Sequence, residues 1–159
     1  MRPFAYARPK NLDEALALLD THGPEAKLLA GGTDLVAQMR IGRTQPKIVI
    51  DLKGIATLRS DIVAVDSRLR LGALATMTDV IDDTQVQRHF PALVEAARVV
   101  GSIQIRNRAT LAGNICNASP AADTAPALLA YGAIVNLAGV QARRRVPLTE
   151  FFTGRAERS

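Results

Sequence analysis

The chain has 159 residues, of which 48% are hydrophobic and 22% are charged, a composition that suits a globular protein and excludes a disordered one. Its 20 Lys and Arg residues against 15 Asp and Glu residues give a net charge of +5, but the basic residues are mostly spread singly and only 4% of residues are aromatic. This distribution argues against a nucleic-acid-binding protein, which needs clustered cations and aromatic platforms for bases.

The chain begins with a short extended segment and a capped helix. Residues 4–8 are predicted to be extended. Asn11 is then a typical N-cap, with Glu14 three residues later as in a capping box, and leucines and alanines recur at helical spacing over residues 12–19. We expect Gly23 to end this helix, because glycine readily adopts the left-handed conformation that follows a helix.

A glycine turn joins the next strand to the next helix. The apolar run at residues 26–30 is too short for a helix and stops at two glycines, so we predict a buried strand. Residues 34–40 follow as a helix, with Asp34 expected as its N-cap, and residues 47–52 form another strand. The order strand, turn, helix, strand indicates a parallel βαβ-like beginning.

The remainder of the chain predicts antiparallel strands and short helices, which makes the whole a mixed α and β protein. Two strands joined by a tight turn at Asp66 and Ser67 are expected at residues 61–65 and 68–73. Further helices are expected at residues 78–83, 91–100 and 122–131, and further strands at residues 133–137 and 142–147.

Residues 109–130 read ATLAGNICNASPAADTAPALLA and contain no Trp, Tyr, Phe, Lys or Glu. Their first part is predicted to be a long loop rich in Gly, Asn, Ser and Pro, and such loops tend to be functional or disordered. The segment carries too little charge to suggest disorder. We infer that another group packs against its backbone.

Two glycine turns are candidate binding elements. Residues 30–34, AGGTD, lie between a strand and a helix start, where glycines admit a close anion and Thr33 offers a hydroxyl donor, although a plain strand-to-helix turn explains the pattern equally well. The turn matches neither GxGxxG nor a P-loop, which argues against a standard Rossmann or P-loop protein. A second turn, TLAGN at residues 110–114, would let the two grip one extended ligand such as a dinucleotide.

Cys116 is the only cysteine, so the chain alone can build no intrachain disulfide, Cys-rich zinc site or iron–sulfur cluster. This fits a reducing, cytoplasmic setting. The start has no apolar core of signal-peptide length, and no stretch approaches the roughly 20 apolar residues of a membrane span. His22 and His89 are far apart in polar settings and are expected to be surface residues rather than ligands or bases.

Nearly the whole chain resembles the flavoprotein (medium) subunit of molybdenum hydroxylases, the group that contains carbon monoxide dehydrogenase and xanthine dehydrogenase. The resemblance is carried, in the family's order, by FAYARPKNLDEALALL, AGGTDL, IRNRATLAGNICNASPAADTAPALLA and RRRVPLTEFFTG. It implies an α+β fold, the FAD-binding fold of the vanillyl-alcohol oxidase (PCMH) type. Residues 1–54 would form a small α/β subdomain, and residues 55–159 would form a second, incomplete α+β subdomain.

The resemblance also implies a cofactor site. Residues 30–34 would wrap the FAD diphosphate, residues 110–114 would follow the diphosphate and the ribityl chain, and Ser119 and Asp123 would hydrogen-bond the ribityl, ribose or adenine part. The predicted FAD-binding residues are Ala30, Gly31, Gly32, Thr33, Asp34, Thr110, Leu111, Ala112, Gly113, Asn114, Ser119 and Asp123. Small side chains would then leave room for the flavin. The flavin carries the redox chemistry, so we predict no catalytic acid, base or nucleophile and no metal ligand.

In such enzymes electrons pass from a molybdenum-cofactor large subunit through [2Fe–2S] clusters on a small subunit to FAD, and the resemblance implies these partners. The chain departs from the family at Ala112-Gly113, where many relatives have two glycines. The resemblance also implies a departure at the end, where we expect the C-terminal subdomain of the family to be absent. We expect a truncation, a frameshift or a separately encoded C-terminal half. The alternatives are a truncated interaction module that no longer holds flavin and a basic nucleotide- or RNA-binding domain.

Overall fold

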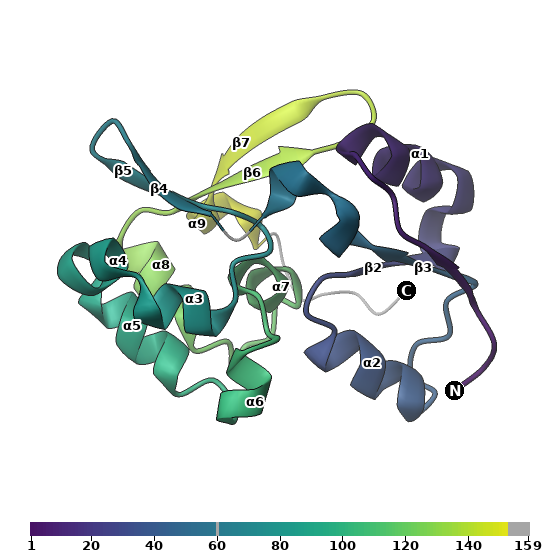
Figure 1. The fold of residues 1–159 in the computed structure, drawn as a ribbon, viewed down its shortest axis with the longest axis horizontal. Coiled ribbons are helices and arrows are strands. Elements are labelled where there is room, and N and C mark those ends of the chain that lie inside the picture. Colours follow the sequence, from purple (N-terminus) through teal and green to yellow (C-terminus); the bar gives the residue numbers. More distant parts are fainter. Residues whose placement is uncertain (60, 153–159) are drawn as a thin grey trace.

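The computed structural model describes residues 1–59 and 61–152, and it has the mixed helical and strand architecture that the sequence predicts (Figure 1). The N-terminal part holds a parallel sheet of β1 (Ala5–Ala7), β2 (Ala26–Leu29) and β3 (Ile48–Asp51) in the order β1-β3-β2. Helices α1 (Leu12–His22) and α2 (Thr33–Arg40) lie on opposite sides of this sheet in Figure 1. The predicted βαβ-like beginning is therefore confirmed.

The first helix is set by the local signals in its sequence. Asn11 is the N-cap of α1, and its side chain accepts a hydrogen bond from the Glu14 amide at 2.9 Å. The Glu14 carboxylate reaches back to the amide of Lys10 rather than to that of Asn11, so the capping box is shifted by one residue. Gly23 ends the helix with a φ of 49°. Short 3₁₀ turns lie at Gly23–Glu25, Leu52–Gly54 and Ala56–Leu58.

The central strand of the parallel sheet is β3, and all four of its residues are buried. Strand β2 lies at the edge of the sheet, where Ala26 is buried but Leu28 is 43% exposed, so the prediction of a buried strand here was wrong. The reason is the strand order: the short apolar run pairs on one side only. Leu29 is in register with Asp51, which places the carboxyl ends of β2 and β3 side by side.

The second part of the chain combines two antiparallel hairpins with short helices. The first hairpin joins β4 (Ile62–Val65) to β5 (Arg68–Leu71), and the predicted turn at Asp66 and Ser67 is confirmed by their positive φ values. The second joins β6 (Ile134–Ala138) to β7 (Arg143–Pro147). The helices are α3 (Met77–Asp82), α4 (Thr84–His89), α5 (Pro91–Arg98), α6 (Ile103–Arg106), α7 (Leu111–Cys116), α8 (Thr124–Ala130) and α9 (Leu148–Phe151).

The small-residue segment is more helical than the sequence suggests. Helix α7 lies inside the stretch that was expected to be a loop, and α6 and α4 were not expected at all. These helices have only four to six residues, so their apolar spacing is too short to identify from periodicity. The end of the RRRVPLTEFFTG segment, residues 153 and 154, lies outside the described residues.

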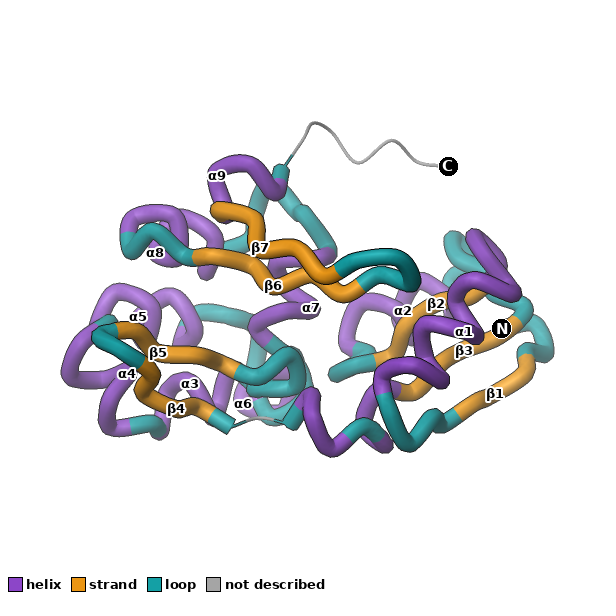
Figure 2. The backbone as a smooth tube through the Cα atoms, turned by 90° about the horizontal axis from the view of Figure 1, so that it is seen from above, coloured by secondary structure: helices purple, strands orange, loops and turns teal. Residues whose placement is uncertain are grey.

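Two hydrophobic clusters form the interior. One packs α1 against the parallel sheet and contains Ala15, Ala26, Ile48, Ile50 and Ile55. The other packs α3, α4 and α5 together with residues 109–111, and its buried members include Met77, Val80 and Val86. Figure 2 shows the β6–β7 hairpin extending from the helical part toward α1. Across residues 1–59 and 61–152, no helix has the length and hydropathy needed to cross a bilayer.

Candidate functional site

The candidate site lies at the carboxyl edge of the parallel sheet. The glycine turn Ala30–Gly32 follows β2 and Lys53 follows β3, so the register of these strands brings the turn and the lysine to the same edge. Ligands of open α/β sheets bind outside the carboxyl ends of the strands. Gly32 is the N-cap of α2 and has a φ of 82°, which a residue with a Cβ rarely adopts.

The expectation that Asp34 is the N-cap of α2 was wrong. The helix begins at Thr33, and Asp34 lies in its first turn with an exposed side chain. Gly32 takes the cap position because its left-handed backbone turns the chain directly into the helix. An acidic residue in the first turn still interacts favourably with the helix dipole.

The first glycine turn packs directly against the residues that precede the second one. A Cβ on Gly31 would lie 1.9 Å from the carbonyl oxygen of Arg108 and 2.8 Å from its carbonyl carbon, so only glycine allows this approach. Residues 109–111 are held in turn by residues 75–77, because the Met77 amide donates to the Ala109 carbonyl at 2.9 Å and the Leu111 amide donates to the Ala75 carbonyl at 2.9 Å. Thr76 and Thr110 thus form an antiparallel bridge beside the first glycine turn.

A small cleft of about 70 Å³ opens where these segments meet. Two of the residues that line it, Lys53 and Arg108, are cationic, and within the described part of the chain no acidic residue lines it. The Thr110 hydroxyl and the Asn107 side-chain amide supply further donors, whereas the Thr76 hydroxyl already donates to Asp79 Oδ2. The lining residues are Ala30, Gly31, Lys53, Leu74, Thr76, Asn107, Arg108 and Thr110. A cationic, donor-rich cleft fits an anionic group such as a phosphate.

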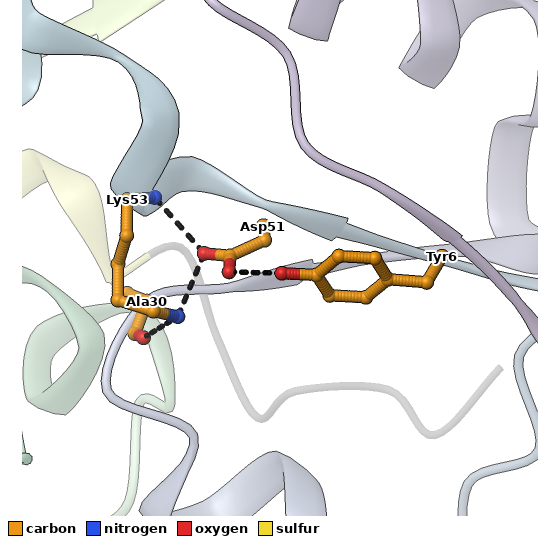
Figure 3. Close-up of polar contacts among 4 residues, drawn as sticks. All are labelled: Tyr6, Ala30, Asp51 and Lys53. Carbon is orange, nitrogen blue, oxygen red and sulfur yellow. Dashed lines mark hydrogen bonds and ion pairs between the residues drawn. The ribbon is translucent and has the colours of Figure 1, made fainter.

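A polar chain ties this edge of the sheet together (Figure 3). The hydroxyl of Tyr6 on β1 donates to Oδ2 of Asp51, the last residue of β3. The amide of Lys53 donates to Asp51 Oδ1 at 3.0 Å, and its Nζ lies 2.7 Å from the same oxygen. Lys53 Nζ also donates to the Ala30 carbonyl at 3.2 Å. The lysine therefore connects the end of β3 to the start of the glycine turn.

These polar contacts shift the pKa values of Asp51 and Tyr6. Burial alone would raise the pKa of Asp51, but the hydrogen bonds from Lys53 and Tyr6 outweigh it and hold the pKa below its ordinary value. The hydrogen bond to Asp51, helped by desolvation, raises the pKa of Tyr6. At neutral pH Asp51 is therefore ionised and Tyr6 is protonated, the states in which the tyrosine donates and the carboxylate accepts.

The second glycine turn is the start of α7. Thr110 is the N-cap, and its hydroxyl accepts a hydrogen bond from the Gly113 amide at 3.1 Å. A Cβ on Gly113 would lie 2.7 Å from that hydroxyl oxygen, so glycine keeps the cap free. Asn114 accepts a hydrogen bond from the buried hydroxyl of Thr124 at 2.6 Å, which joins α7 to α8.

The predicted site residues fall into two groups. Ala30, Gly31 and Thr110 are brought together in the cleft. The other nine lie outside its lining: Gly32, Thr33, Asp34, Leu111, Ala112, Gly113, Asn114, Ser119 and Asp123. Leu111 is buried, whereas Asp123 is exposed and makes no side-chain cap for α8. Their contacts with a cofactor stay predictions.

The turn that carries Ser119 has unusual backbone geometry. Ala118 has a φ of 47°, and Ser119 Oγ then accepts a hydrogen bond from the Ala121 amide at 3.2 Å.

Cys116, at the end of α7, is exposed as a residue, but protein atoms desolvate its thiol and raise its pKa. A protonated thiol is a poor nucleophile.

Sequence reasoning missed Lys53. For Arg106 and Arg108 the sequence left two roles open, contact with the cofactor phosphates or a partner protein and a solvated place on the surface. Lys53 could have been found from the parallel strand pattern, since it follows the second strand directly and the carboxyl ends of parallel strands meet. Arg108 lines the cleft, and its backbone contacts Gly31. Arg106 instead donates from its guanidinium to the Val100 and Gly101 carbonyls at the end of α5. Among the described residues, no group of three His, Cys, Asp or Glu side chains is placed to hold a metal ion.

The parallel strand edge, the first glycine turn and the two cations form a cleft whose chemistry suits an anionic group. The chain matches the family described as the FAD binding domain in molybdopterin dehydrogenase over residues 2–159, and it belongs to that family. It is 41% identical over 150 residues to a protein named xanthine dehydrogenase FAD-binding subunit from Escherichia coli O157:H7. The aligned residues cover 94% of this chain and 51% of that protein. The resemblance identified from the sequence is thus confirmed.

Similar findings come from carbon monoxide dehydrogenase of Hydrogenophaga pseudoflava. Its medium chain is 39% identical over 151 residues, covering 95% of this chain and 52% of the relative. A solved structure of that dehydrogenase, in a form that lacks the Mo-pyranopterin moiety of the molybdenum cofactor, matches with a TM-score of 0.92 over 97% of this chain and 54% of the solved chain. The chain spans about half the length of the curated relatives it matches.

Proposed function

We propose that this chain is the FAD-binding part of the flavoprotein subunit of a molybdenum hydroxylase. The observation that carries the proposal is the cleft at the carboxyl edge of the parallel sheet, where both glycine segments meet beside Lys53 and Arg108. Backbone amides at a glycine turn and two cations are what a dinucleotide diphosphate requires. Membership of the FAD-binding family gives the dinucleotide its identity.

In this proposal the residues of the chain bind, orient and shield the cofactor, and the flavin ring transfers the electrons. Residues 30–34 surround the diphosphate, and residues 110–114 follow it toward the ribityl chain. Ser119 and Asp123, beside the start of α8, hydrogen-bond the hydroxyl groups of the ribityl, ribose or adenine part. The exposed carboxylate of Asp123 suits an acceptor for sugar hydroxyls.

The partners of the chain follow from the same proposal. One relative is named as an FAD-binding subunit and another as a medium chain, and such names describe parts of a larger enzyme. We infer a molybdenum-cofactor large subunit and a [2Fe–2S] small subunit that delivers electrons to FAD. The oxidised substrate would bind on the large subunit.

The proposal also includes the type of FAD-binding fold, its division into subdomains and the cellular location. The fold would be the FAD-binding fold of the PCMH type, divided into residues 1–54 and 55–159. Two separate hydrophobic clusters, one around the parallel sheet and one among α3, α4 and α5, support two subdomains, with Ile55 packing in the first cluster. The cytoplasmic location inferred from the single cysteine stays a prediction.

The test is the absorption spectrum of the purified chain, followed by identification of the cofactor released on denaturation. The proposal expects flavin absorption bands, and FAD rather than FMN in the released fraction. Apoprotein should also regain these bands when titrated with FAD. A chain that neither carries nor regains flavin would instead be the alternative, an interaction module that no longer holds the cofactor.

A further inference from the structure

Lys53 is placed as a rigid cation at the edge of the cleft. It lies in the 3₁₀ turn Leu52–Gly54 directly after β3, and its side chain is 34% exposed. Its ammonium is anchored on one side by Asp51 Oδ1 at 2.7 Å and on the other by the Ala30 carbonyl at 3.2 Å. A lysine held at two points loses little further side-chain entropy when it meets a ligand.

The anchoring leaves the lysine able to bind one more acceptor. An ammonium group has three N–H donors, and Asp51 and Ala30 take two of them. Lys53 lines the cleft together with Arg108, so the third donor has a cavity available. The bond to the neutral Ala30 carbonyl is also long, and a charged acceptor forms a stronger hydrogen bond than a carbonyl does.

Asp51 serves to hold the lysine rather than to meet the ligand. Its carboxylate is 4% exposed, and both of its oxygens already accept hydrogen bonds, Oδ1 from Lys53 and Oδ2 from Tyr6 (Figure 3). The tyrosine fixes the carboxylate from the β1 side of the sheet. The lysine therefore keeps its position at the carboxyl end of β3 whether or not the cleft is filled.

We propose that Lys53 is a direct ligand of the diphosphate group of the bound dinucleotide and that Tyr6 and Asp51 position it. This inference rests on the proposed FAD-binding function and adds to it a cation from outside both glycine motifs. The ammonium keeps its contact with Asp51 and uses its free donor for a phosphate oxygen. The same contact helps to hold the Ala30–Gly32 turn against the ligand, because Lys53 already bonds to Ala30.

The experiment is a titration of apoprotein with FAD at several salt concentrations, using wild type, Lys53→Gln and Lys53→Arg. Lys27→Gln is the matched control, because Lys27 lies on the neighbouring strand β2, is exposed and lies outside the cleft lining, and its loss changes the net charge equally. We expect Lys53→Gln to weaken FAD binding about tenfold or more and to reduce its salt dependence. Lys53→Arg should stay within about threefold of wild type, since arginine keeps the charge.

Three outcomes would overturn the proposal, and they are distinguishable. If Lys53→Gln keeps the affinity and the salt dependence of wild type, the lysine does not touch the ligand. If both Lys53 variants bind weakly with unchanged salt dependence and lowered thermal stability, the lysine only holds the fold. If wild type itself binds no FAD, the proposed function fails, and this inference fails with it.

Discussion

Gly31 gives the sharpest test of how the cleft is built. A methyl group at this position would lie 1.9 Å from the Arg108 carbonyl oxygen, whereas Cβ contacts in proteins essentially never fall below 3.0 Å. The obstacle is backbone on both sides and cannot rotate away as a side chain could. In Gly31→Ala the first glycine turn and the Arg108 segment must therefore separate until that distance is restored. Overpacking of this kind costs about 1–3 kcal/mol of folding free energy.

The separation should also affect ligand binding, because Gly31 and Arg108 line the same cleft. We expect Gly31→Ala to weaken FAD binding about tenfold or more, which corresponds to about 1.4 kcal/mol. The assays are urea denaturation of the apoprotein and titration with FAD. Gly139→Ala is the control, since its Cβ would lie 3.4 Å from the nearest atom, the Ala142 carbonyl oxygen. A Gly31→Ala variant with the stability and affinity of wild type would refute the close approach of Gly31 to Arg108.

Three further variants test the polar contacts. Thr124→Val removes the 2.6 Å hydrogen bond from a fully buried hydroxyl to Asn114 and should lower the free energy of unfolding by about 1–3 kcal/mol in urea denaturation. An unchanged value would show that α7 and α8 are held by packing alone. Asp123→Ala should leave the apoprotein within about 0.5 kcal/mol of wild type, because its side chain caps nothing, yet weaken FAD binding by about 1.5–3 kcal/mol. Lost stability with unchanged affinity would instead assign Asp123 to the fold. Asp51→Asn should be less stable than wild type near neutral pH. Because the folded-state pKa of Asp51 lies below its ordinary value of 3.8, this difference is fully present above pH 3.8 and closes as the pH falls through the folded-state pKa. A difference that persists in acid would assign it to packing.

Much of the fold was predictable because the signals for it are local. The Asn11 cap, the Gly23 end and the Asp66-Ser67 turn depend on residues within one turn of each other, and the structure confirms each one. Asp34 was misassigned because aspartate is the commoner cap, whereas the left-handed backbone of Gly32 decides the start of the helix.

The composition of the cleft depends on contacts between segments that are distant in the sequence. The sequence alone did not reveal these contacts. Gly31 meets Arg108 across 77 positions only because residues 75–77 hold residues 109–111 in place. Lys53 reaches Ala30 only through the register that pairs Leu29 with Asp51. A glycine motif thus identifies a turn that can accept an anion, but the cations beside it come from the tertiary fold.

The small residues of segment 109–130 have more than one physical cause. Ala109 and Thr110 are buried, and their backbone is held beside residues 75–77 and Gly31, which favours small side chains at both positions. Ala122 and Thr124 are small because they are buried where α7 meets α8. Chain packing therefore accounts for these positions without a cofactor. The cofactor explanation is needed chiefly for residues 118–121, where small side chains remain at least partly accessible beside a strained turn, so it is there that a bound flavin should produce the largest change in solvent exposure.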